Sequence, residues 1–501
     1  MNEPVEARER PFPWAAVLVV AAVVVAALLA VAGRYGYHRD ELYFLACGRR
    51  LAWGFVDQPP ITPAIARLSE IIVPGSLVGL RLWPALMAGA LVVVTALAAR
   101  QLGAGRLGQI AVAVIAACMP GFLLAGHLLA TETLDLVAWA ATTLLVIRIV
   151  RRGDPRMWVA VGAVLGIGLE NKWSIAFLVA GLLIGLVVTS ERRVLFTPWF
   201  LVGVAVAFAI WLPNLLWQAD HGWPQLDMIR TIQQDSVGVG SAIAWLPLQI
   251  LITGLVPAIV WVAGLVRVLR DPRTRPYRFL GIAYLVLAAV FALSAGDKFY
   301  YAAGLYVPLL GAGALPLERW LMRHRRGLVR PLASVALALT TLVLLPVAMP
   351  IIPVTSFADS SINDLNPEMG EQVGWPDLAR EVAHVWRTIP ASERSTAIVL
   401  TANYGEAGAL ERFGPSLGLP PPYSGHNTYW WWSTPPTSTR TAVLVGWSPS
   451  YARRFFGSVV RAGTISNPYG VQNDEEGAPI LLARDPVRPL PALWLAMRHY
   501  D

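Results

Sequence analysis

Charged side chains are scarce in this sequence. Asp, Glu, Lys and Arg make up only 14% of its 501 residues, whereas 56% are hydrophobic. In an average soluble protein, about a quarter of the residues are charged. The composition therefore argues against a purely soluble protein and indicates one that is embedded in a membrane.

Other familiar elements of soluble enzymes are also missing. The two cysteines, Cys47 and Cys118, are too few for a disulfide framework, and Cys118 lies inside an apolar run. The sequence has no Walker loop, no dinucleotide-binding glycine fingerprint and no zinc-type spacing of Cys and His. Neither nucleotide hydrolysis nor a soluble nucleotide-sugar site is indicated.

Lysine occurs only twice, as Lys172 and Lys298, so almost every basic residue is an arginine. Despite the net charge of +8, the arginines are not gathered on one soluble face, and we expect no nucleic-acid partner. They instead occupy every second connection between the apolar runs. By the positive-inside rule these connections are cytoplasmic, and so is the N-terminus.

Apolar runs of about 17 to 25 residues are long enough to cross a hydrocarbon core of about 30 Å as helices. We expect about eleven transmembrane helices, at residues 14–33, 80–99, 107–125, 129–147, 157–170, 174–189, 197–216, 244–266, 279–294, 300–316 and 331–350. The first run ends in Ala30-Val31-Ala32, which is similar to a signal-peptide cleavage site, but the run is longer than the apolar part of such a peptide. An odd number of spans places the loops 34–79 and 218–243 and the tail outside the cytoplasmic membrane.

The chain is expected to have two parts. Residues 1–350 form the membrane body, which includes the outer loop 34–79, and residues 351–501 form an extracytoplasmic soluble domain. The tail combines an amphipathic stretch, Trp375–Trp386, with β-branched runs such as Ala397–Thr401, a pattern typical of a small α/β domain. Its three tryptophans at residues 430–432 suit either packing at the membrane surface or a sugar-binding platform.

Two acidic pairs are candidates for chemistry. Asp40 and Glu41 follow the first span directly, and a carboxylate at the membrane boundary is costly unless water, a cation or a polar cleft receives it. Ordinary juxtamembrane charge is the alternative. Glu132 and Asp135 are three residues apart and therefore share one face of a helix. If this helix end meets the first loop, the four carboxylates form one acidic pocket suited to a general base or a divalent metal.

Both lysines map to the outer ends of spans, where the positive-inside rule disfavours them. A lysine binds phosphate as a point charge, so Lys172 and Lys298 suggest an anionic group held at the membrane surface. Snorkelling of the side chain, or pairing of Lys298 with Asp297, is the structural alternative. Arg81 and His221 lie at the same face and are further candidates.

These segments, in this order, resemble the membrane glycosyltransferases of the GT-C superfamily, in particular the family 39-like branch that includes protein mannosyltransferases and the aminoarabinose transferase of lipid A. The matching segments are Asp40-Glu41-Leu42-Tyr43, Gly54 through Pro60, Thr133-Leu134-Asp135, Gly168 through Trp173, and Lys298-Phe299-Tyr300-Tyr301 through Pro308. The resemblance implies a mainly α, polytopic membrane fold of GT-C type. It also implies transfer of a sugar from a polyprenyl-phosphate donor to an envelope lipid, glycan or protein acceptor on the outer face.

The resemblance also implies roles for individual residues. Asp40 becomes the general base, with Glu41 and Asp135 orienting the nucleophile. The donor phosphate would be bound by Lys172, Lys298, Arg81 and His221, and the substrates would be bound by Tyr43, Glu132 and Tyr301. A divalent metal, Mg²⁺ or Mn²⁺, at Asp40 and Asp135 is possible but not required. A single base opposite the lipid phosphate predicts inversion at the anomeric carbon.

The sequence departs from the protein mannosyltransferases in lacking a large inserted loop domain, which weakens the expectation of a protein acceptor. Two other functions compete with the enzyme. A transporter or flippase of lipid-linked sugars would place charge near the bilayer midplane and often shows two related halves, which are not found here. A non-catalytic envelope assembly protein would use the tail as a binding module, and Asp40 would be dispensable.

Overall fold

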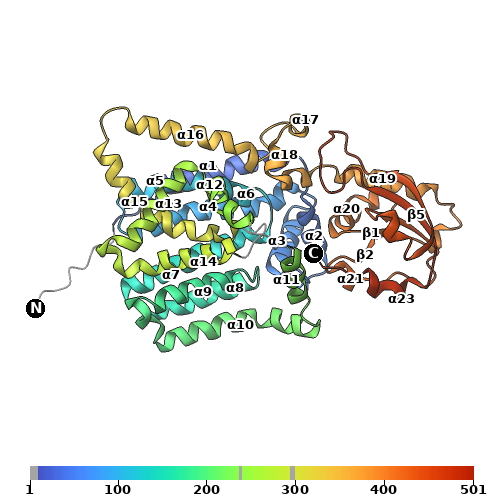
Figure 1. Ribbon diagram of the computed structural model, residues 1–501, viewed down its shortest axis with the longest axis horizontal. Coiled ribbons are helices and arrows are strands. Elements are labelled where there is room, and N and C mark those ends of the chain that lie inside the picture. The colour runs from blue at the N-terminus through green and yellow to red at the C-terminus, as the bar shows by residue number, and fades with distance from the viewer. Residues whose placement is uncertain (1–9, 236–239, 294–298, 501) are drawn as a thin grey trace, which may run out of the picture. The chain divides into compact units, whose positions relative to one another are not determined.

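The computed structural model describes residues 10–235, 240–293 and 299–500. The chain divides into two compact units (Figure 1). The first comprises Met1–Ala32, Arg81–Leu216 and Ser236–Met349, and the second comprises Gly33–Leu80, Trp217–Asp235 and Pro350–Asp501. The tail therefore forms one compact unit with the loop 34–79 and with part of the loop 218–243, while the functional division into two domains stays a prediction.

The first unit is built of helices alone in its described part. Its α-helices are α1 (Trp14–Val31), α4 (Leu77–Gln101), α5 (Arg106–Ala117), α6 (Pro120–His127), α7 (Thr131–Arg152), α8 (Trp158–Leu169), α9 (Ile175–Val187), α10 (Pro198–Asp220), α12 (Gly240–Thr253), α13 (Leu255–Arg270), α14 (Arg278–Leu293), α15 (Tyr306–Arg323) and α16 (Val329–Ala348), with α4 and α10 each extending a few residues into the second unit. Short 3₁₀ turns connect them: η1 (Pro155–Met157), η2 (Ser190–Leu195), η3 (Pro272–Tyr277) and η4 (Phe299–Leu305). Packing pairs include α13 with α15, α9 with α14, and α7 with α8.

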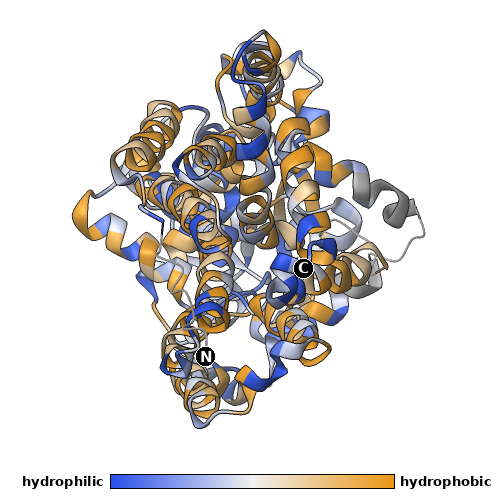
Figure 2. Ribbon diagram, turned by 90° about the vertical axis from the view of Figure 1, so that its left-hand side faces the viewer, coloured by the Kyte–Doolittle hydropathy of each residue, from blue (hydrophilic) through white to orange (hydrophobic). Residues whose placement is uncertain are grey.

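The outer surface of this helical unit is apolar. Its helices are coloured largely as hydrophobic in Figure 2, and large side chains such as Leu201 and Val343 are 68% and 71% exposed. Exposed apolar surface of this extent is unfavourable in water and suits contact with lipid. The predicted multi-pass, mainly α membrane fold is confirmed.

The number of described helices long enough to span a membrane is lower than the eleven expected from the sequence. Seven described helices are long and apolar enough to cross a membrane, or nine if each of two bent pairs is one span. The bends occur between α5 and α6, by 59°, and between α12 and α13, by 110°, where Pro120 and the left-handed Gly254 interrupt the helices. All eleven predicted segments coincide with helices, but eleven complete spans would require the shorter Pro155–Leu169 and Ile175–Val187 to cross as well.

The second unit contains a five-stranded sheet with helices packed on it. Its elements are α2 (Arg39–Arg49), α3 (Ile61–Ile72), α11 (Pro224–Asp235), α17 (Val354–Ala358), α18 (Ile362–Leu365), η5 (Pro367–Gln372), α19 (Trp375–Thr388), η6 (Arg394–Thr396), β1 (Ala397–Thr401), α20 (Tyr404–Phe413), η7 (Pro415–Leu417), β2 (Tyr423–Ser424), α21 (Tyr429–Trp432), β3 (Thr441–Val445), α22 (Pro449–Ala452), β4 (Phe456–Thr464), β5 (Pro479–Pro486), α23 (Leu490–Leu493) and η8 (Trp494–Met497). The strand order is β2-β1-β3-β5-β4, with β1 parallel to β2 and β3, and β5 antiparallel to β3 and β4. The predicted small α/β domain is confirmed.

Helix α20 joins the sheet to the first outer loop. It packs against β1 and β2 and also against α2 of the loop. A Cβ atom at Gly408 would lie 2.9 Å from the Cβ of Leu42, so only glycine allows the two helices to approach this closely. This contact fixes the first residues of α2, including Asp40, relative to α20.

Candidate active site

At the N-terminus of α2, the side chains of the two adjacent acids have different environments. The carboxylate of Glu41 accepts the His38 backbone N–H at 2.9 Å and is completely buried, which makes it one half of a capping box. The other half is the His38 ring, whose Nδ1 accepts the Asp40 backbone N–H at 3.2 Å. The Asp40 side chain is left out of the cap and is 36% exposed, so a substrate can reach it.

A tyrosine from α20 orients the Asp40 carboxylate. Its Oδ1 accepts a hydrogen bond from Tyr404 Oη at 2.8 Å. Burial, together with the neighbouring Asp40 charge, raises the pKa of Tyr404 well above its usual value, so the phenol stays a proton donor across the physiological range. The result is a partly exposed carboxylate held in one orientation on a rigid helix end.

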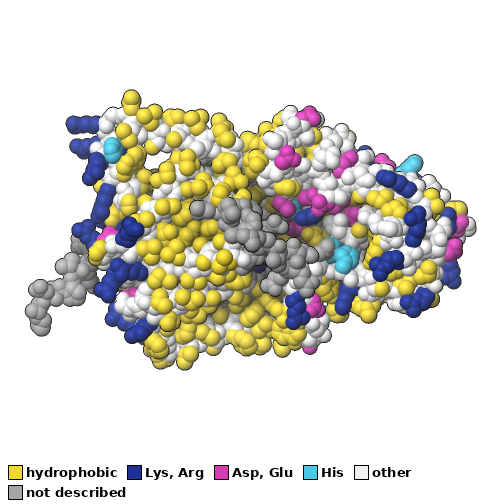
Figure 3. Space-filling model, viewed as in Figure 1, with side chains coloured by type: hydrophobic (Ala, Val, Ile, Leu, Met, Phe, Trp, Pro, Cys, Tyr) yellow, Lys and Arg dark blue, Asp and Glu magenta, His cyan; other side chains and the backbone are white. Residues whose placement is uncertain are grey.

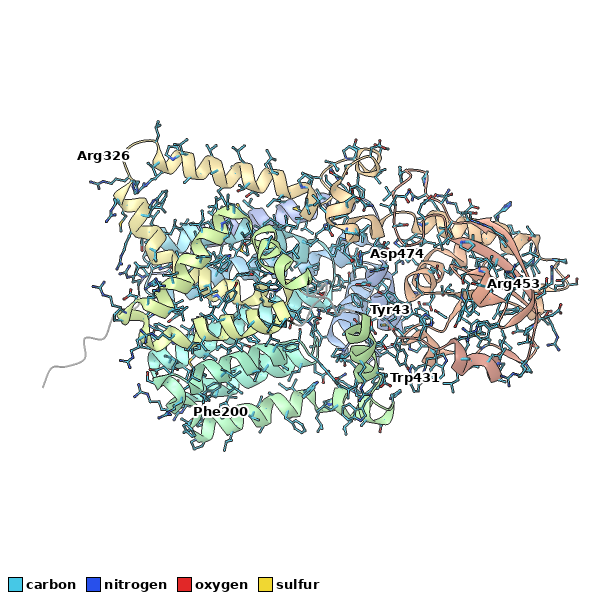
Figure 4. All side chains as sticks on the ribbon, viewed as in Figure 1. Tyr43, Phe200, Arg326, Trp431, Arg453 and Asp474 are labelled. Atoms are coloured by element: carbon cyan, nitrogen blue, oxygen red, sulfur yellow. The ribbon has the colours of Figure 1, made fainter. Side chains whose placement is uncertain are left out.

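His38 connects the same helix end to the tail through a hydrogen bond with Glu368. Because its Nδ1 accepts a hydrogen bond from the Asp40 backbone N–H, the neutral ring carries its proton on Nε2, which donates to Glu368 Oε2 at 3.0 Å. Burial lowers the pKa of His38, but the hydrogen bond to Glu368 and the nearby carboxylates outweigh burial and raise it. The neighbouring Arg39 reaches Asp474 of the tail at 2.8 Å (Figure 4 labels Asp474).

A further carboxyl of the loop, that of Asp57, is hydrogen-bonded to Tyr43 of α2. Tyr43 is fully buried, donates from its Oη to Asp57 Oδ1 at 2.8 Å, and is also hydrogen-bonded to Thr428 Oγ1 at 2.8 Å (Figure 4 labels Tyr43). The rings of Tyr43 and Tyr404 pack with their centroids 4.8 Å apart. Burial raises the pKa of Asp57 to about 7, with the Asp40 charge adding to the rise and the Tyr43 hydrogen bond opposing it.

Sequence reasoning missed three members of this cluster. Asp57 lies inside the predicted Gly54–Pro60 segment, but nothing in its spacing singled it out. Tyr404 and Thr428 are 364 and 385 positions away from their partners in the loop, so no local pattern could reveal them. Tyr43, predicted to bind substrate, has its hydroxyl engaged by Asp57 and Thr428.

The first unit brings together a second group of predicted residues. Lys172 Nζ forms an ion pair with Glu132 Oε1, which also accepts a hydrogen bond from Tyr300 Oη at 3.3 Å. The same ammonium lies 5.1 Å from the ring centroid of Tyr301 and 5.6 Å from that of Tyr300, within the range of cation–π attraction. Glu132, Lys172 and Tyr301 are thus gathered at the start of α7.

Asp135 belongs to the same end of α7. Its Oδ1 accepts from Trp139 Nε1 at 3.1 Å and its Oδ2 accepts from Ser174 Oγ at 2.8 Å. Ser174 is two residues after Lys172, so the turn between α8 and α9 supplies a partner to each acid of the predicted pair. The acidic pocket predicted from Asp40, Glu41, Glu132 and Asp135 stays a prediction, because the two pairs belong to different compact units.

The remaining predicted residues lie elsewhere. Arg81 is buried in the first unit, where its Nη1 donates to Ala32 O at 2.8 Å and lies 3.5 Å from His127 Nε2. His221, in the second unit, stacks on Trp217 at a centroid distance of 4.0 Å and meets the ring of Trp431 at 5.1 Å. Lys298 lies outside the described residues. Within the described ranges, no group of three or more His, Cys, Asp or Glu side chains is arranged to hold a metal ion.

Comparison with known proteins gives a family match over part of the chain. Residues 57–217 match the family described as dolichyl-phosphate-mannose-protein mannosyltransferase. No curated protein matches the chain in sequence.

Several solved structures share the fold. ArnT from Cupriavidus metallidurans bound to undecaprenyl phosphate has a TM-score of 0.57 at 16% identity, over 94% of this chain and 98% of that chain. Arabinofuranosyltransferase AftD from Mycobacteria has a TM-score of 0.51 at 16% identity, over 93% of this chain and 41% of that chain. The Archaeoglobus fulgidus oligosaccharyltransferase in complex with zinc and sulfate has a TM-score of 0.50 at 14% identity, over 79% of this chain and 61% of that chain. The family match covers residues 57–217 only, and the solved structures, at 16% identity or less, show that the chain shares their fold.

Proposed function

We propose that the protein transfers a sugar from a polyprenyl-phosphate donor to an acceptor of the cell envelope, on the outer face of the cytoplasmic membrane. The observation that carries the proposal is the Asp40 carboxylate, which is partly exposed, oriented by Tyr404 and left free by a helix cap that uses Glu41 instead. The family match to mannosyltransferases that use dolichyl phosphate, and the fold shared with a protein bound to undecaprenyl phosphate, support a lipid-phosphate donor.

Asp40 acts as the general base of the transfer. It takes the proton from the acceptor nucleophile while that atom attacks the anomeric carbon, and the bond between this carbon and the phosphate oxygen breaks. The electron pair of that bond leaves with the lipid phosphate. Tyr404 keeps one carboxylate oxygen occupied, so the other is presented to the acceptor. Attack opposite the leaving group inverts the configuration of the sugar, and no covalent sugar–enzyme intermediate forms.

Lys172 receives the phosphate in this proposal. It is held by Glu132 and by the faces of Tyr300 and Tyr301, so its ammonium is positioned before the donor arrives. The phosphate competes with Glu132 for the ammonium. Arg81, His221 and Lys298 remain proposed further contributors to phosphate binding, and a divalent metal remains a proposed but dispensable addition.

The proposal is tested with purified full-length protein, a radiolabelled polyprenyl-phosphate sugar and an extract of envelope glycolipids. We expect a glycosylated product of inverted configuration, and we expect Asp40→Asn to lower the rate by about 10²- to 10⁴-fold, as loss of a general base does. Asp364→Asn is the matched control, since it removes an exposed carboxylate of the same unit. Unchanged transfer in Asp40→Asn would refute the assignment of the base. Movement of the lipid-linked sugar across vesicles without any product would support a flippase instead.

A further inference from the structure

A hollow of about 550 Å³ lies between α13 and α15 of the first unit. It is lined by Ala263, Val266, Arg267, Arg270, Asp271, Pro316, Arg319, Trp320 and Arg323. Four of these nine residues are arginines. Figure 3 shows basic side chains gathered at one end of the helices, and Figure 4 labels Arg326 there, just beyond the C-terminus of α15.

The packing of the two helices explains why the hollow exists. A Cβ atom at Gly264 would lie 1.9 Å from Leu309 O, and one at Gly313 would lie 2.1 Å from Val260 O, so the backbones touch at these glycines. The next turns carry arginines in place of small residues, and Pro316 interrupts the hydrogen bonding of α15. The helices are therefore in backbone contact at one level and separated by long side chains at the next.

The lining of the hollow carries an excess of positive charge, with four arginines against one aspartate. No Asp or Glu forms an ion pair with Arg267, Arg270, Arg319 or Arg323 in the part of the chain that the structure describes. The guanidinium of Arg267 is instead anchored by neutral carbonyl groups, with Nη1 donating to Ala312 O at 2.7 Å and Nη2 to Leu102 O at 3.0 Å. Asp271 is the single acid of the lining, and its carboxylate accepts the Arg273 backbone N–H at 2.9 Å.

The other side of the hollow is apolar and continues onto the lipid-facing surface. Val266 is 45% exposed, Val262 one turn away is 43% exposed, and Met322 is 52% exposed. Trp320, whose amphipathic ring suits the membrane boundary, is half-buried in the lining. A soluble anion would use the arginines but not this apolar face, whereas a lipid would use both.

We propose that this hollow binds the head group of an anionic phospholipid. The phosphate is held by Arg319 and Arg323, because guanidinium groups match phosphate oxygens in a bidentate geometry, and the charge of the anchored Arg267 adds to the attraction. The acyl chains lie along the apolar face that includes Val262 and Val266. The positive-inside rule explains why arginines occur at this end of the helices, but it does not explain their convergence on one hollow with an apolar wall. The proposal is independent of the proposed transferase activity.

The test uses the full-length protein in detergent, titrated separately with phosphatidylglycerol and phosphatidylcholine, with bound lipid counted by native mass spectrometry. We expect at least about tenfold tighter binding of phosphatidylglycerol. The double substitution Arg319→Gln and Arg323→Gln should weaken this binding by about fivefold for each arginine, hence by about 30-fold. The matched control, Arg325→Gln with Arg326→Gln, removes the same charge from the adjacent turn outside the lining and should change binding by less than about twofold.

Three outcomes would overturn the proposal. Equal binding of the two lipids would show that the site does not distinguish an anionic from a zwitterionic head group. This comparison needs only the wild-type protein. An equal loss in both double variants would show diffuse attraction without a site. Displacement of phosphatidylglycerol by inorganic phosphate at the same concentration would identify a site for a soluble anion.

Discussion

Replacing Asp57 with asparagine should stabilise the protein at alkaline pH and leave its stability unchanged in acid. Burial raises the pKa of this carboxyl from 3.8 to about 7 in the folded protein. As the pH rises from about 4 to 7, the unfolded chain therefore loses this proton while the folded chain keeps it, and the folded state becomes less stable. At about 1.36 kcal/mol for each pKa unit, the loss reaches at most about 4 kcal/mol above pH 7.

The amide of Asp57→Asn never ionises and still accepts the hydrogen bond from Tyr43, so the variant escapes this loss. The thermal unfolding midpoints of both proteins in detergent, measured from pH 4 to 8.5, should coincide at the acid end and separate in favour of the variant as the pH rises. Asp364→Asn, an exposed control in the same unit, should keep a constant difference from the wild type. A difference between Asp57→Asn and wild type that does not change with pH would refute a buried carboxyl titrating near 7.

The same substitution should alter the pH dependence of sugar transfer. Ionised Asp57 adds a negative charge close to the proposed site, and a negative charge there would stabilise the oxocarbenium-like transition state of sugar transfer. We expect the wild-type rate to rise through about pH 7 and the rise to be absent in Asp57→Asn, with the affinity for the donor little changed. A profile that keeps the same rise in the variant would show that another group controls it.

Three further changes probe the packing and the charges of the two units. Tyr404→Phe removes a hydrogen bond to the carboxylate of Asp40, the proposed base. This bond is worth about 1.5 kcal/mol or more, so steady-state transfer assays should show kcat lowered by about tenfold or more without a comparable change in KM. Lys172→Met should raise KM for the donor by more than about tenfold. Glu132→Gln should lower this KM, because the Lys172 ammonium loses the carboxylate that competes with the phosphate. Equal effects of the two substitutions on KM would contradict a phosphate-binding role for the lysine. Gly446→Ala, whose Cβ would lie 2.0 Å from a buried glutamate oxygen, should lower the unfolding midpoint more than Gly470→Ala, which has a similar left-handed backbone but no atom within 4 Å of the added carbon.

The fold was predictable because it depends on patterns that are local in sequence. Apolar run length located the eleven helical segments, and a short β-branched run located β1. The number of complete spans was not predictable in the same way. A bend at Pro120 or Gly254 changes how many helices cross, and apolar length alone does not report the angle of a bend.

The site was predictable only where its partners are close in sequence or where a residue type is rare. The scarcity of lysine pointed to Lys172, and the structure places it against Glu132, 40 positions away. The hydroxyl of Tyr404 and the carboxyl of Asp57 gave no such signal, since tyrosines and aspartates occur throughout the chain. Their relevance arises from packing of α20 on α2, which depends on a close approach at Gly408. Residue type and spacing cannot show that two helices so far apart in sequence will touch.

The first loop also shows why adjacent acids in a motif need not share a function. Residues i and i+1 of a helix point about 100° apart, so Asp40 and Glu41 leave the first turn of α2 in different directions. The cap requires an acceptor three residues after His38, and that position is Glu41. With the cap satisfied there, Asp40 is free to meet Tyr404 and a substrate. The rigidity that the proposed general base needs is thus supplied by its neighbour, and we expect a loss of activity in a Glu41 variant to follow from displacement of Asp40, because the Glu41 carboxylate is buried in the cap.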